Sequence, residues 1–329
     1  MHRVFTSDYR PLYFLSALGA GGMSVSVFMY LMFLVPHPDT PVPTFEDIAK
    51  VYAEGSLAAA AGVSVALALI AGFATLHVFL LVANIAAYRR FVASPAFEQF
   101  RTTNAEVGLM AVPLTYAMAV NVAFVLGAVF VPGLWSVVEF LLPVALVAFV
   151  AIGAYALALF GRYLTRILVH TGFDAEDTNH FSQVLPAFAF SMIAVGFSSS
   201  AAMSHVTATS VLGMLGTLFF LLAAMMWVVV KLPVSFGAIL RKGMAVEAGP
   251  TLWMGIPILT LVGIAFVRFS SGIAHNFMDT TLDPRITFVV LGGLDAAQLV
   301  MGLVGWMVMR RQGYFATFVR GEKSSIPSY

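Results

Sequence analysis

Three ionisable side chains lie inside long apolar stretches of this chain, and they are its clearest candidates for chemistry. Arg268 lies in the last third of the seventh apolar stretch, Asp295 about ten residues into the eighth, and Glu139 about one turn into the fourth. A charged group in hydrocarbon costs about 2.5 to 3.5 kcal/mol on insertion scales. Each of the three therefore needs a structural partner or a function.

Arg268 and Asp295 could form an ion pair, because antiparallel helices joined by a short turn bring such positions together. This structural pairing is the interpretation that we favour. Alternatively, Arg268 faces a pathway, where its positive charge attracts an anion, or it extends towards the membrane interface. In a proton-coupled mechanism, Asp295 or Glu139 would be the group that titrates.

Glu139 either reaches the membrane interface, which we favour, or marks a cation or proton site. His77 lies in the second stretch and His275 ends the seventh. A lone histidine among apolar residues is more often a hydrogen-bonded packing residue than a ligand, although His77 stays a candidate proton site. Haem needs two histidines at matching depth on facing helices, and these two do not match. We therefore expect no haem and no other cofactor.

Catalytic motifs of soluble enzymes are missing from the sequence. It contains no Gly-rich phosphate loop before a helix, no nucleophile elbow and no cluster of histidines and acids with metal-ligand spacing. With no cysteine, it has no disulfide, thiolate metal site or cysteine nucleophile. A formal net charge of +1 argues against nucleic acid as a partner. The sequence therefore predicts neither an enzyme nor a metalloprotein.

The composition is typical of a membrane protein. The chain is 60% hydrophobic and 10% charged, whereas an average soluble protein is about 25% charged. A membrane span needs about 20 apolar residues. Eight stretches meet this requirement, at residues 12–35, 56–86, 107–131, 134–160, 182–202, 207–230, 251–273 and 286–309. We expect one all-α transmembrane domain over residues 1–329, with a segment at 1–11 before the first span and a tail at 310–329 after the last.

Proline and glycine mark the odd-numbered stretches. Pro113, Pro186 and Pro257 lie in the third, fifth and seventh, while the first contains Gly19, Gly21 and Gly22. A proline inside a membrane helix is tolerated where neighbouring helices or water replace the lost hydrogen bond. We therefore expect one hairpin repeated four times, whose broken odd-numbered helices face protein or a cavity. Phe197, on the fifth stretch, could narrow a pore.

The basic residues indicate the orientation, because they gather in short cytoplasmic loops. With eight spans, one side receives fourteen of them: Arg3, Arg10, Arg89, Arg90, Arg101, Arg162, Arg166, Lys231, Arg241, Lys242, Arg310, Arg311, Arg320 and Lys323. The other side receives only Lys50 and Arg285. We therefore expect both chain ends on the cytoplasmic side of a bacterial inner membrane. The N-terminal segment lacks the pattern of a cleaved signal peptide, so the first helix is expected to act as the targeting signal.

Four segments carry a resemblance to a known family. They are DYRPLYFLSALGAGGMSVSVF, ANIAAYRRFVASPAFEQF leading into VGLMAVPLTYAM, NHFSQVLPAFAFSMIAVGFSS, and VEAGPTLWMGIPILTLV. In these segments, along nearly its whole length, the chain resembles the tellurite-resistance/dicarboxylate transporter family, which includes bacterial tellurite-resistance protein A and plant slow-type anion channels. The resemblance implies inner, proline-kinked helices around a pore, an outer ring of even-numbered helices, and a homotrimer with one pore in each subunit.

The sequence departs from the family pattern at its end. Family members have ten spans in five hairpins, and their ninth helix carries a phenylalanine that closes the pore. This chain ends at GEKSSIPSY after the eighth span, so a fifth hairpin is absent and no gating phenylalanine can be assigned. Either the chain is a fragment, which the stop just after Pro327 favours, or it is an eight-span variant closed by another subunit.

The function expected from these observations is a channel or channel-like transporter for small anions. Pro113, Pro186 and Pro257 would shape the pathway, and Arg268 would attract the anion. The alternatives are a proton-coupled transporter of a dicarboxylate, sulfite or another oxyanion, a cation-conducting variant, and the membrane subunit of a quinone-linked oxidoreductase. The expected partners are small inorganic or organic anions, lipid and further copies of the chain.

Overall fold

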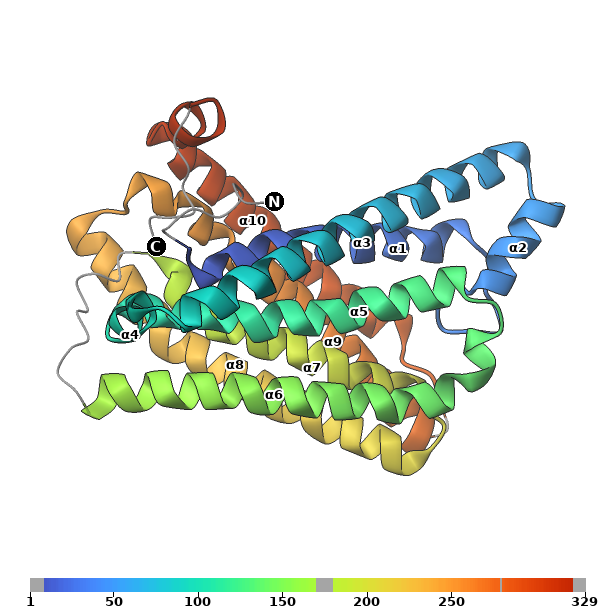
Figure 1. Ribbon diagram of the computed structural model, residues 1–329. Coiled ribbons are helices and arrows are strands. Elements are labelled where there is room, and N and C mark those ends of the chain that lie inside the picture. The colour runs from blue at the N-terminus through green and yellow to red at the C-terminus, as the bar shows by residue number, and fades with distance from the viewer. Residues whose placement is uncertain (1–8, 170–179, 279, 322–329) are drawn as a thin grey trace.

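The computed structural model describes residues 9–169, 180–278 and 280–321. Within them, eight helices are long and apolar enough to cross a membrane, which confirms the predicted number of spans. Their α-helical parts are α1 (Phe14–Leu34), α3 (Leu57–Val92), α5 (Ala111–Phe130), α6 (Val138–Val169), α7 (Leu185–Met203), α8 (Thr207–Lys242), α9 (Gly255–Phe277) and α10 (Pro284–Arg311). Figure 1 shows them as a bundle of long, roughly aligned helices.

The remaining elements in the described residues are short helices. Two are α-helices, α2 (Phe45–Glu54) and α4 (Pro95–Arg101), which lie at opposite ends of the bundle (Figure 1). Five are 3-10 helices, η1 (Pro11–Tyr13), η2 (Asn104–Met110), η3 (Leu134–Val137), η5 (Phe181–Val184) and η6 (Val246–Trp253). One is a π-helical turn, η7 (Phe315–Val319). The connector after the first span therefore contains a helix, α2.

The prolines expected to break the odd-numbered spans lie where each span changes from a 3-10 helix to an α-helix, in the first turn of the α-helix. Pro186 is the second residue of α7, and Pro113 and Pro257 are the third residues of α5 and α9. In a first turn the amide hydrogen has no partner inside the helix, so a proline ring costs no hydrogen bond there. Each of these α-helices follows a 3-10 helix, so the proline marks a change of helix type. The prolines inside described α-helices are Pro143 in α6 and Pro233 in α8.

The contacts between helices follow a simple order. Helix α1 contacts α5, α5 contacts α7, and α7 contacts α9. On their other sides, α3 packs on α1, α6 and α8 pack on α7, and α10 packs on α9. Helix α7 is the most enclosed of the eight. In its span 89% of the most apolar 18-residue segment is buried, whereas 0% of the corresponding segment of α10 is buried. The core of the bundle is therefore centred on α7.

Glycines allow the neighbours of α7 to approach closely. A Cβ added at Gly196 would lie 2.1 Å from the ring of Phe149 on α6. A Cβ at Gly213 of α8 would lie 2.6 Å from the backbone nitrogen of Ala201, and one at Gly272 of α9 would lie 2.4 Å from the Ala201 carbonyl oxygen. Small residues at helix contacts let backbones pack closely in membranes. These glycines thus fix the spacing of α6, α8 and α9 around α7.

Helix α10 presents most of its surface outward. It contacts α9 and η6 but no other described α-helix extensively. Phe288 and Val289 are 78% and 70% exposed, and Leu299 is 65% exposed. Apolar side chains on an outward face are the expected surface of a helix in lipid, where they need no protein partner.

Candidate functional site

Arg268 lies in the middle of α9 and faces α7. Its Nη1 donates a hydrogen bond of 2.8 Å to the hydroxyl oxygen of Ser199 and a longer one of 3.4 Å to the carbonyl oxygen of Val195. Both acceptors are on α7 and carry no net charge. Among the described residues, no carboxylate forms an ion pair with Arg268. The guanidinium therefore keeps an uncompensated positive charge inside the bundle.

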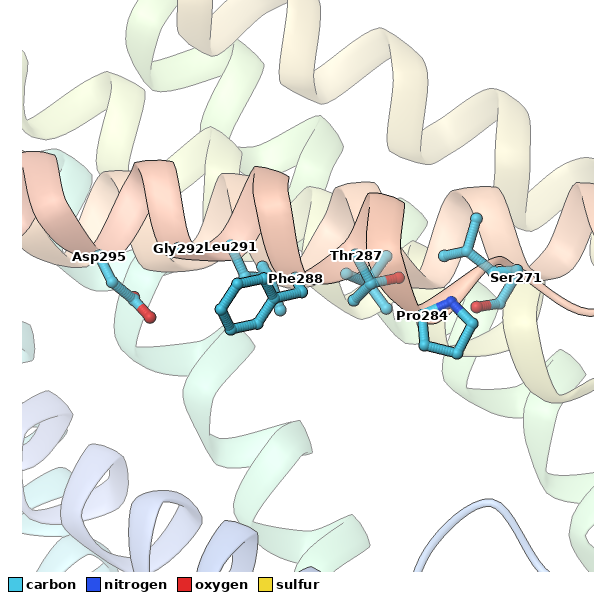
Figure 2. Close-up of a pocket in the computed structure, with 9 residues that line it drawn as sticks. Ser271, Pro284, Thr287, Phe288, Leu291, Gly292 and Asp295 are labelled. Atoms are coloured by element: carbon cyan, nitrogen blue, oxygen red, sulfur yellow. The ribbon is translucent and has the colours of Figure 1, made fainter.

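Asp295 does not form the ion pair that we expected with Arg268. It is exposed and lines an open pocket of about 590 Å³ between α9 and α10, together with Val267, Ser271 and Phe288. Figure 2 shows its carboxylate pointing away from α10, on the side of Phe288. The two residues are separated because Arg268 bonds to α7, whereas Asp295 is exposed and lines this open pocket.

Further polar groups lie on α7 and on α5. Ser191 is four residues before Val195, and Ser199 is four residues after it, so the three lie along one row of the helix. The Ser191 hydroxyl is fully buried and has no hydrogen-bond partner in the described structure. From α5, Asn121 Nδ2 lies 3.4 Å from the sulfur of Met192. Helices α5, α7 and α9 together supply hydrogen-bond donors and one cation, but no carboxylate.

Glu139 has a different environment, at the turn between α7 and α8. One carboxylate oxygen accepts a hydrogen bond of 2.7 Å from the Ser204 hydroxyl, and the other accepts one of 2.6 Å from the His205 backbone N–H. Through these two hydrogen bonds, Glu139 joins the α7–α8 turn to α6. It does not contact Arg268, so the structure does not bring together the ionisable residues that we selected from the sequence.

His77 is a buried packing residue between α3 and α1. It is 1% exposed, and its Nδ1 lies 2.7 Å from the carbonyl oxygen of Ala17. Its Nε2 has no partner in the described residues. A Cβ at Gly21 would lie 2.7 Å from Nδ1 and 2.6 Å from Met118. The close packing of His77 and Met118 against α1 therefore requires a glycine at position 21. This packing explains Gly21 without any role in a pathway.

The other proposed pathway residues differ in their surroundings. A Cβ at Gly19 would meet nothing within 4 Å, and one at Gly22 would meet only Met118, at 3.8 Å. Phe197 does not project into open space. It is 5% exposed and stacks on Phe220 of α8, with ring centroids 5.7 Å apart. Since its ring fills the contact of α7 with α8, the structure argues against Phe197 as a constriction.

A buried ion pair that we did not predict ties α6 to η2. Arg166 Nε lies 2.7 Å from Glu106 Oε2, and Glu106 is 4% exposed. The other guanidinium nitrogens of Arg166 donate to the carbonyl oxygens of Thr102 and Thr103. The signal for this pair was present in the sequence, because both residues lie at span ends assigned to the same side of the membrane.

In comparisons with known proteins, no protein-family model, no curated protein and no solved structure matches this chain. The class of the molecule therefore rests on its own fold. Eight long apolar helices are consistent with an integral membrane protein that crosses the bilayer several times.

Proposed function

We propose that this protein is a channel or channel-like transporter for small anions. In this proposal α1, α5, α7 and α9 line the pathway and α3, α6, α8 and α10 form an outer layer. The observation that carries it is the environment of Arg268, which lies in a membrane-spanning helix and bonds only to neutral acceptors among the described residues. A cation in the membrane that lacks a carboxylate partner marks a functional site.

Neutral hydrogen-bond partners suit an anion pathway. They hold the guanidinium in place without cancelling its charge, so its potential remains available in a region of low dielectric. The buried Ser191 hydroxyl and the Asn121 amide add neutral donors on the neighbouring turns of α7 and on α5. A passing chloride or nitrate could exchange part of its hydration for these groups and would still be able to leave, because none of them except Arg268 is charged.

Proton coupling has less support than passive conduction. Asp295 lines the open pocket between α9 and α10, and Glu139 is bonded at the α7–α8 turn. Neither carboxylate contacts Arg268, so a proton on either has no direct route to an anion held there. By the resemblance described above, the proposal also includes membership of the tellurite-resistance/dicarboxylate transporter family, a homotrimeric assembly and cytoplasmic chain ends in a bacterial inner membrane.

A substitution at Arg268 tests the proposal. Purified wild-type protein and the Arg268→Gln and Arg268→Lys variants are reconstituted in liposomes, and chloride and nitrate efflux are measured. We expect Arg268→Gln to lower anion efflux at least about tenfold, which corresponds to 1.4 kcal/mol, while Arg268→Lys keeps part of it. Unchanged efflux in a folded Arg268→Gln protein would remove Arg268 from the pathway.

A further inference from the structure

Two histidines meet at one end of the bundle, away from the groups around Arg268. His205 belongs to the turn between α7 and α8, and His275 lies in the last turn of α9. Nδ1 of His205 and Nε2 of His275 are 3.0 Å apart. The ring planes are inclined by 73°, with centroids 5.0 Å apart. Each ring therefore directs one nitrogen at the other, and both side chains are exposed to solvent.

The backbones that carry these rings are held by separate contacts. The His205 N–H donates to Glu139 of α6. On the other side, Asn276, next to His275, donates to the Ser210 hydroxyl of α8 at 3.1 Å. The Ser210 hydroxyl in turn donates to the Ala201 carbonyl oxygen at 2.8 Å. Three helices thus position the two imidazoles before any ligand arrives, which reduces the entropy cost of binding.

This geometry is suited to a metal ion. In the neutral pair an N–H of one ring donates a hydrogen bond to the nitrogen of the other ring. A metal cation can take the place of that hydrogen. Neutral imidazole is a preferred ligand of Zn²⁺, Cu²⁺ and Ni²⁺. A Zn–N bond of about 2.0 to 2.1 Å places two tetrahedral nitrogen ligands about 3.4 Å apart. To bind the metal, the two nitrogens need to move apart by about 0.4 Å and the rings need to turn so that both lone pairs point at the ion.

We propose that His205 Nδ1 and His275 Nε2 bind a divalent transition-metal ion, with water molecules completing its coordination. No third histidine, cysteine or acid in the described ranges joins them in a cluster suited to a metal, so this is a two-ligand site. Binding there cross-links the α7–α8 turn to the end of α9. The proposal does not depend on the anion pathway, and it is tested by metal binding itself.

The test is a titration of the purified protein, without a polyhistidine tag, with Zn²⁺ or Ni²⁺ alone by calorimetry. We expect one ion for each chain and a rise in the unfolding temperature when the metal is present. His205→Ala and His275→Ala should each weaken binding at least about tenfold, a loss of 1.4 kcal/mol. His37→Ala, which changes a histidine whose Nδ1 lies 2.7 Å from the Val35 carbonyl oxygen, should leave binding unchanged.

A second variant separates metal binding from structure. His275→Gln retains a side chain able to hydrogen-bond His205 but removes the imidazole ligand. We expect it to unfold at the wild-type temperature without metal and to lose the metal-dependent rise. Metal binding that persists in the folded His205→Ala/His275→Ala double variant, or no binding to the wild-type protein, would overturn the proposal.

Discussion

Arg268 on α9 and Ser199 on α7 are joined by a hydrogen bond of 2.8 Å. This bond turns the guanidinium towards the most enclosed helix of the bundle, whereas Asp295 of α10 is exposed and lines an open pocket. The positive charge of Arg268 therefore stays available inside the bundle, without a carboxylate partner among the described residues.

The close approach of α8 to α7 predicts a cost for any side chain at Gly213. In Gly213→Ala the new Cβ would lie 2.6 Å from the backbone nitrogen of Ala201, and backbone cannot move aside cheaply. We expect the free energy of unfolding to fall by about 1 to 3 kcal/mol, measured by SDS titration in mixed micelles. The matched control is Gly62→Ala on α3, where a Cβ meets nothing within 4 Å. Equal stability of the two variants would contradict the packing described.

The placement of Asp295 predicts that removing its charge stabilises the protein. No described residue forms an ion pair with it. An unpaired carboxylate within a span destabilises the folded protein, because it loses hydration in the membrane. We expect Asp295→Asn to raise the free energy of unfolding by about 1 to 3 kcal/mol, whereas Asp295→Glu, which keeps the charge, should not. A less stable Asp295→Asn protein would show that the carboxylate binds a partner.

The buried pair of Glu106 and Arg166 predicts a large effect from one substitution. Glu106→Gln leaves the Arg166 guanidinium, which is only 15% exposed, without its carboxylate. We expect a loss of about 3 kcal/mol in the free energy of unfolding. Glu98→Gln is the control, because Glu98 is 77% exposed in its pair with Arg101, and such surface pairs contribute about 0 to 1 kcal/mol. A similar small loss for both variants would contradict the burial of Glu106.

Glu46 on α2 predicts a dependence of stability on pH. Its carboxylate accepts a hydrogen bond of 2.7 Å from the Gly133 N–H, and this bond lowers the pKa of Glu46 below its usual value of 4.5. A lowered pKa in the folded state gives stability that is present above the unfolded pKa and is lost as pH falls through the folded pKa.

The Glu46→Gln variant removes this titration. Unfolding temperatures measured between pH 7 and pH 3 should therefore fall more steeply for the wild-type protein than for Glu46→Gln. Parallel curves for the two proteins would show that the bond to Gly133 does not form in solution.

The sequence was sufficient to predict the eight spans, because hydrophobic length alone specifies them. It did not reveal the form of each helix break, since a proline in a first turn and a proline in a helix interior look alike in an apolar stretch. Pro186 and Pro143 illustrate the difference: Pro186 lies in the first turn of α7, whereas Pro143 lies inside α6.

The partners of polar residues were harder to predict than the spans. The expected pairing of Arg268 with Asp295 came from their adjacency in a helical hairpin, but the rotation of each helix about its own axis decides which side chains meet. That rotation is set by close contacts such as Gly272 against Ala201, which local sequence patterns do not reveal. The His205–His275 contact joins segments 70 residues apart and was missed for the same reason.

Ion selectivity of the wild-type protein tests the central proposal most directly. Purified protein in liposomes is given chloride, nitrate and potassium gradients separately, with the membrane potential clamped. The proposal predicts flux of chloride and nitrate that saturates poorly with concentration, together with little flux of potassium. Flux of potassium above that of both anions, or no flux of any of the three ions, would contradict it.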